Sequence, residues 1–125
     1  MMYIYGFEKL EVWQLSRKLV LTIYKLTKDF PSEEKFILTS QIRRSCLSVS
    51  ANLAEGTSRG TAKDQAHFTQ IAYSSLMELL NHLIVSADLG YLSEKTLNDI
   101  RPEIELLSNK LNTFHKSQLK NKILR

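Results

Sequence analysis

Residues 41–56 read QIRRSCLSVSANLAEG, and this stretch decides the fold. Apolar and small residues recur in it every three or four positions, which is the spacing of one face of an α-helix. They are Ile42, Ser45, Val49, either Asn52 or Leu53, and Gly56. Small side chains on that face let a neighbouring backbone approach closely, and a buried Asn52 would have to find hydrogen-bond partners. The stretch therefore predicts a buried helix that packs tightly against a neighbour.

Helical periodicity continues on both sides of this stretch. Ser32, Thr61 and Ser93 each precede a helical pattern and are predicted to cap its N-terminus, whereas Gly90 follows the end of the third pattern. Pro102 lies inside the last pattern, so we expect a kink or a break there. The predicted helices span residues 9–29, 33–55, 62–89 and 94–116.

Short connections between long helices favour neighbours that run in opposite directions. The sequence therefore predicts an all-α fold, an antiparallel up-down-up-down four-helix bundle. One domain is expected over residues 1–125, with the last ten or so residues forming a basic, frayed tail. The chain has only 4 Gly and 2 Pro, fewer than an all-β fold with many tight turns needs.

Composition restricts the class of protein further. Apolar residues make up 43% and charged residues 24% of the chain, as in an ordinary globular domain. Cys46 is the single cysteine and is expected to be a small buried residue. The sequence has no apolar run of membrane-spanning length and no signal-peptide pattern, so we expect a cytoplasmic protein without a membrane partner.

The motifs of common enzymes are absent. The sequence has no Glu-x-x-His pair, no Gly-x-Ser-x-Gly turn and no glycine-rich phosphate loop. We therefore predict no catalytic residue, no metal site and no cofactor. An alternative is a hydrolase in which Glu55 or Glu78 works with an arginine between subunits, and it would need a carboxylate with a strongly shifted pKa.

Charge is distributed unevenly along a chain with a net charge of +4. Residues 61–105 hold three Lys and Arg against seven Asp and Glu, whereas residues 106–125 hold five against none. A basic surface suits an anionic partner, although it also serves solubility. The candidate nucleic-acid contacts are Arg43, Arg44, Arg59, Lys63, Lys116, Lys120, Lys122 and Arg125. Arg43 and Arg44 have two open interpretations, since they could bind phosphate or pair with an acid across subunits.

The first predicted helix carries two adjacent apolar stripes. One stripe suffices for the core of a monomeric bundle, so the second predicts an interface with another copy of the chain. Its candidate residues are Trp13, Val20 and Tyr24.

Several short motifs together resemble a known family. They are Phe7-Glu8-Lys9-Leu10 with Val12-Trp13-Gln14, Phe30-Pro31-Ser32-Glu33-Glu34, Gln41-Ile42-Arg43-Arg44-Ser45, Asn52-Leu53-Ala54-Glu55-Gly56 and Leu89-Gly90-Tyr91-Leu92. These are similar to the bacterial four helix bundle proteins, which include those encoded by intervening sequences in 23S ribosomal RNA genes. The resemblance implies a ring, typically a homopentamer, and no known enzyme activity. It also implies kinship with the accessory variability determinant of diversity-generating retroelements, which works with nucleic acid.

The sequence as a whole therefore predicts a non-enzymatic, oligomeric helical-bundle protein with RNA or a ribonucleoprotein as its candidate partner. The alternative is a structural or adaptor protein with no nucleic-acid role, in which the basic tail serves solubility.

Overall fold

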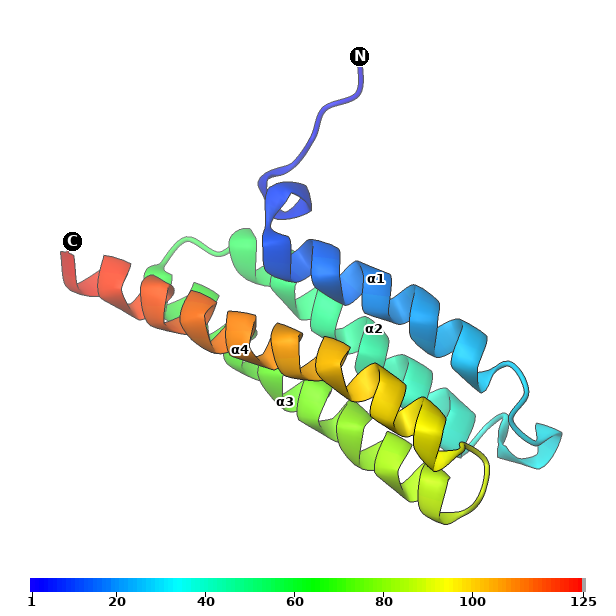
Figure 1. Cartoon of the computed structure of the whole chain (residues 1–125). Helices are drawn as coiled ribbons and strands as arrows, with labels where there is room; N and C mark the ends of the chain where they lie inside the picture. Colours follow the sequence, from blue (N-terminus) through cyan, green and yellow to red (C-terminus); the bar gives the residue numbers. More distant parts are fainter. Residues whose placement is uncertain (125) are drawn as a thin grey trace.

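The chain folds into four long helices that lie side by side, with a short 3₁₀ turn before each of the first two (Figure 1). The computed structural model describes residues 1–124, and side chains for residues 1–120. No strand occurs in the described residues, which confirms the predicted all-α class. The elements are η1 (Gly6–Lys9), α1 (Glu11–Thr27), η2 (Ser32–Glu34), α2 (Leu38–Thr57), α3 (Ala62–Asp88) and α4 (Glu94–Leu124).

Each helix packs against the next along the chain, and α4 returns to pack against α1. Arg43, near the start of α2, bonds Thr27 at the end of α1 with an N···O distance of 3.0 Å. Thr69, near the start of α3, donates to the side chain of Gln118 near the end of α4 over 2.7 Å. The chain thus passes along the bundle four times, and the colours of Figure 1 trace this path from the N-terminus to the C-terminus.

The core lies on the axis between the four helices. Every helix contributes fully buried aliphatic side chains to it, in the three-and-four spacing that the sequence shows. The largest of these are Leu19, Ile23, Ile42, Leu53, Leu76, Leu79, Leu83, Ile104, Leu107 and Leu111. Cys46 is also fully buried among them, as expected.

The predicted ends of the helices hold in most places. Thr61 accepts a hydrogen bond from the Asp64 N–H over 3.1 Å, and Ser93 accepts one from the Thr96 N–H over 3.0 Å, so both cap their helices. Gly90 has φ +81°, a conformation that glycine adopts without strain, and it ends α3 as predicted.

The start of the second helix was predicted wrongly. Ser32 does not cap it, because residues 32–34 form a 3₁₀ turn and α2 begins only at Leu38. Ile37 interrupts the helical geometry with φ −120° and ψ −95°. Tyr91 donates to the Glu34 carboxylate over 2.9 Å, which anchors the 3₁₀ turn to the loop after α3. This contact is long-range, so the local sequence pattern does not show it.

The last helix is longer than expected and unbroken. It continues through Pro102 without a break, because Pro102 lies on the exposed face, where solvent can hydrate the carbonyl that loses its partner. It also continues past residue 116, where the sequence predicted a frayed tail. Gln118 is buried and accepts the bond from Thr69, and this contact holds the last turns against α3. No helix in the described part of the chain combines the length and apolar character needed to cross a bilayer.

Candidate nucleic-acid interface

Arg43 is fixed against the carbonyl end of α1. Its Nε donates to Thr27 Oγ1 over 3.0 Å and its Nη2 donates to the Tyr24 carbonyl over 3.4 Å. Its guanidinium carbon lies 4.4 Å from the centroid of the Tyr24 ring, in cation–π geometry. The positive charge therefore sits at the negative pole of the α1 dipole, where it is stabilising. Arg43 thus has an intrachain role that neither sequence interpretation included.

Arg44 lies beside Arg43 and is exposed. Together they line a groove of about 430 Å³ between the end of α1 and the start of α2. We call this the basic groove. Its lining holds three cations, two aromatic rings and no carboxylate. The lining residues are Tyr24, Lys35, Phe36, Thr39, Ser40, Arg43, Arg44 and Leu47.

Aromatic rings are available to a ligand in this groove. Phe36 is 85% exposed and Tyr24 is 37% exposed. The Lys35 ammonium lies 5.5 Å from the centroid of the Phe36 ring. The sequence shows no basic motif interleaved with aromatic residues, because Tyr24 and Phe36 come from different elements. Only the fold brings them together beside the cations.

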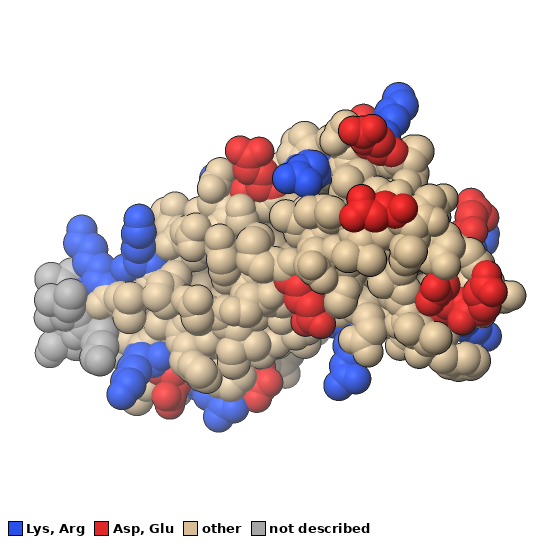
Figure 2. Space-filling model, turned by 90° about the horizontal axis from the view of Figure 1, so that it is seen from below, with Lys and Arg blue, Asp and Glu red and all other residues tan. Residues whose placement is uncertain are grey.

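The other predicted cations whose side chains the structure describes lie at the opposite end of the bundle. Arg59 follows the C-terminus of α2, roughly 20 Å from Arg44 along the helix axis at 1.5 Å per residue. Lys116 and Lys120 flank Gln118 near the end of α4. Figure 2 shows cationic side chains gathered around this end of α4 and acidic ones over the other end of the same face. The predicted contacts therefore form two separate basic regions.

The second basic region is less available than the sequence suggests. Arg59 pairs with the Glu55 carboxylate over 2.8 Å and stacks over the Phe68 ring at 4.6 Å. Lys63, Lys116 and Lys120 are exposed. The side chains of Lys122 and Arg125 lie outside the described residues.

The candidate interface residues of α1 are partly covered by the chain itself. Trp13 is half-buried and packs edge-on against Phe7 of η1, with ring centroids 5.1 Å apart. Val20 is also half-buried and packs against the core. Tyr24 lies under Arg43. Part of the second apolar stripe is therefore used within one chain.

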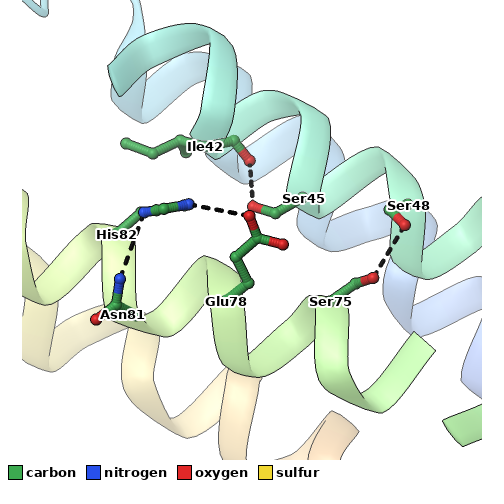
Figure 3. Close-up of polar contacts among 7 residues, drawn as sticks. All are labelled: Ile42, Ser45, Ser48, Ser75, Glu78, Asn81 and His82. Atoms are coloured by element: carbon green, nitrogen blue, oxygen red, sulfur yellow. Dashed lines mark hydrogen bonds and ion pairs between the residues drawn. The ribbon is translucent and has the colours of Figure 1, made fainter. Parts of the chain in front are cut away.

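A polar seam joins α2 to α3 (Figure 3). Ser48 and Ser75 share a hydrogen bond of 2.9 Å across the two helices, and Asn52 donates to the Ser48 carbonyl over 2.8 Å. Ser45 donates back to the Ile42 carbonyl over 3.0 Å. Asn52 is half-buried, not buried as expected, and its amide bonds Ser48 of its own helix. The small side chains of the seam let the helices approach.

The same seam contains His82 and Glu78, a pair that could suggest acid–base chemistry. His82 Nε2 lies 3.3 Å from Glu78 Oε1, and its Nδ1 lies 3.5 Å from the Asn81 amide (Figure 3). The hydroxyls of Ser45 and Ser48 bond elsewhere, so His82 does not activate them. Among the described residues, no three His, Cys, Asp or Glu side chains are grouped to hold a metal ion.

Sequence reasoning missed five residues of the basic groove, which are Lys35, Phe36, Thr39, Ser40 and Leu47. Lys35 and Phe36 were placed inside the second helix, where they would be ordinary surface positions. An exposed phenylalanine beside a lysine was the available signal, but it gains meaning only when the turn brings both to Arg44.

Comparisons with known proteins agree with this architecture. The model of a family described as 23S rRNA-intervening sequence protein matches residues 8–113. A crystal structure from Bacteroides thetaiotaomicron, of a protein with unknown function from the S23 ribosomal protein family, superposes with a TM-score of 0.74. The two sequences are 21% identical, and the match covers 84% of this chain and 98% of that chain. At this identity the likeness shows the fold alone. No curated protein matches this chain.

Proposed function

This chain belongs to the 23S rRNA-intervening sequence protein family, and on that premise we propose that it is a non-enzymatic, oligomeric protein that binds RNA through the basic groove. The composition of that groove carries the proposal. Lys35, Arg43 and Arg44 line it with no carboxylate among them, and Tyr24 and Phe36 add two rings. Phosphates of RNA favour such cations, and unstacked bases favour such rings.

Each cation has a distinct part in this proposal. Arg44 and Lys35 have no acidic partner within 4 Å among the described side chains, so their charge is free for phosphate. Arg43 is held by Tyr24 and Thr27, so it contributes its field and fixes the ring of Tyr24. Arg59 is paired with Glu55, and we assign it no direct contact.

Single strands fit this groove better than duplexes do. Aromatic stacking needs a base that is free of its helix, and phosphate contacts carry little sequence information. We therefore expect binding with weak sequence preference and strong salt dependence. Contacts to phosphates on a single strand give a slope of about −0.7 per phosphate in the logarithmic salt plot.

We further propose that the bundle is antiparallel, up-down-up-down, and assembles as a homopentameric ring. The sequence resemblance supports the ring, as do exposed aliphatic side chains such as Leu21, Ile84 and Leu106 on three of the helices. A ring would repeat the basic groove on every subunit, so avidity would strengthen modest contacts. We include in this proposal a relation to the accessory variability determinant of diversity-generating retroelements, which the sequence resemblance implies.

Fluorescence anisotropy with a mixed-sequence single-stranded RNA tests the function. The test variant is Lys35→Ala with Arg44→Ala, and the control is Lys95→Ala with Arg101→Ala, which removes the same charge from the first half of α4. We expect the test variant to bind more weakly and its salt slope to fall by about 1.4, the share of two phosphates. The affinity of the control variant for RNA should stay within about twofold of the wild-type affinity, because it loses only long-range charge attraction, which salt screens.

The adaptor interpretation is the competing outcome. If the wild-type protein retains no RNA at about 50 mM salt, where phosphate binding is strong, the RNA proposal fails. If both double variants weaken binding equally, net charge rather than the basic groove is responsible. The double variant Lys63→Ala with Lys116→Ala then tests whether the second basic region binds the RNA.

A further inference from the structure

Thr39 carries a buried hydroxyl with no hydrogen-bond partner among the side chains and backbone that the structure describes. It is only 7% exposed, yet it lines both the basic groove and an adjoining hollow of about 260 Å³ under the α1–α2 turn. We call this hollow the turn cavity. Buried hydroxyls are nearly always satisfied in native proteins, so an unsatisfied hydroxyl on a residue that lines two hollows points to a ligand there.

The start of α2 lacks a cap at the same place. Ile37 is the N-cap residue, and no side chain accepts from the first turn. The first N–H groups of a helix have no partner inside it, and they form its positive pole. Thr39 and Ser40 stand in this first turn. The unsatisfied hydroxyl and the free N–H groups are therefore all donors, and they lie together.

The surrounding charges also suit an anion. Lys28, Lys35 and Arg43 line the turn cavity, and its lining contains no carboxylate. The carbonyl end of α1 is nearby and would repel an anion. However, Arg43 covers the Tyr24 carbonyl and Thr27 Oγ1, so its positive charge offsets that pole.

We propose that the N-terminus of α2, with Thr39, Lys35 and Arg43, is a binding site for a phosphate group. The Thr39 hydroxyl and the N–H groups of the first turn donate to its oxygens, and Lys35 supplies charge. The proposal rests on the proposed function in one respect, since we take a phosphate of bound RNA as its occupant. The same donors would also hold inorganic phosphate or a small phosphate ester, and the experiment distinguishes these sources.

The first arm measures thermal unfolding in inorganic phosphate against chloride at matched ionic strength. Binding to the native state alone multiplies the folding equilibrium constant about a hundredfold at a hundred times the Kd. We expect phosphate to raise the Tm of the wild type and of Thr39→Ser, which keeps the hydroxyl. Thr39→Val removes the donor and should lose most of the shift.

Two controls separate a loss of phosphate binding from a general loss of stability. In chloride, Thr39→Val should melt no lower than the wild type, because it removes a polar atom that had no partner. The control is Thr113→Val, whose hydroxyl bonds the Asn109 carbonyl on the exposed side of α4, and it should keep the full phosphate shift. An equal shift in Thr39→Val and the wild type, or no shift beyond chloride, overturns the phosphate site.

The second arm measures the affinity of an oligoribonucleotide with and without a 5′-phosphate. If Thr39→Val weakens both equally, the occupant is a backbone phosphodiester, and if it weakens only the phosphorylated strand, the occupant is a terminal phosphate. If neither RNA binds but phosphate still raises the Tm in a way that depends on Thr39, the site is a site for free phosphate. The proposed RNA function then fails. If Thr39→Val leaves RNA binding unchanged and phosphate does not raise the Tm of the wild type, the phosphate site is overturned. The proposed RNA function is then unaffected.

Discussion

Arg43 lies over the ring of Tyr24 and donates to the carbonyl of the same residue, so one side chain binds both the face and the backbone of its partner. The two residues are 19 positions apart and belong to different helices. The contact joins α1 to α2 where the chain reverses, and it separates the roles of two adjacent arginines.

Arg43→Ala should destabilise the fold, whereas Arg44→Ala should not. The first change removes hydrogen bonds from a charged donor at the carbonyl end of α1, with an expected cost of about 1.5 to 3 kcal/mol. The second changes an exposed side chain, and its effect should stay within about 0.5 kcal/mol. Urea unfolding measures both. Equal loss of stability in the two variants would contradict the assignment of Arg43.

Gly56→Ala should destabilise the contact between α2 and α3. A Cβ at Gly56 would lie 2.8 Å from Phe68 Cβ, so one helix must shift away from the other. Overpacking of this kind costs about 1 to 3 kcal/mol. Gly60→Ala is the matched control, because a Cβ there meets nothing within 4 Å. Thermal unfolding should separate the two variants, and a Gly56→Ala protein as stable as the control would refute the close approach.

The last turns of α4 depend on one buried hydrogen bond. Thr69→Val removes the donor to Gln118 Oε1, which leaves a buried amide oxygen without that partner. We expect a loss of about 1 to 3 kcal/mol in the free energy of unfolding. Hydrogen exchange of residues 116–120 should also accelerate, because their anchor is gone. Unchanged protection in that segment would mean that another contact holds it.

Cys46 should be inert in the folded protein. Burial raises the pKa of its thiol from 9.0 to about 12, and the carboxylate of Glu103 adds to the rise. The thiolate is the reactive form, so a thiol reagent at pH 8 should react only after denaturation. Because the folded pKa is the higher one, this group contributes stability below pH 9 and loses that contribution as the pH rises toward 12. Rapid labelling of the native protein would disprove the burial.

Assembly through α1 predicts a strong effect of its tryptophan. We expect a sedimentation mass several times the 14.4 kDa of one chain, and five times that mass if the ring is a pentamer. Trp13→Ala should dissociate the assembly more than Cys46→Ser does, because interface energy concentrates at aromatic anchors. Cys46→Ser serves as the control for a general loss of core stability. A single-chain mass at micromolar concentration would exclude oligomerisation.

The sequence predicted the features that local spacing controls. The three-and-four recurrence of Val12, Leu15 and Leu19 identified a helix and its core face, because burial requires one apolar side whatever the neighbour is. Thr61, Ser93 and Gly90 marked helix ends through bonds and backbone angles that span three or four residues. The all-α class followed from these local signals together with the scarcity of glycine and proline.

The candidate site depended on the tertiary structure. Residues 35–37 lie between the 3₁₀ turn and α2, and that turn is anchored by the bond from Tyr91 to Glu34, 57 positions away. Arg43 is engaged by Tyr24, and Gln118 by Thr69, 49 positions away. Partners at such separations leave no trace in local periodicity, since a helix pattern specifies which face is buried and not which side chain lies opposite. The sequence therefore determined the helical segments, apart from the start of the second and the end of the fourth, and which of their faces are apolar. Only packing decided which cations are paired and which face an open groove.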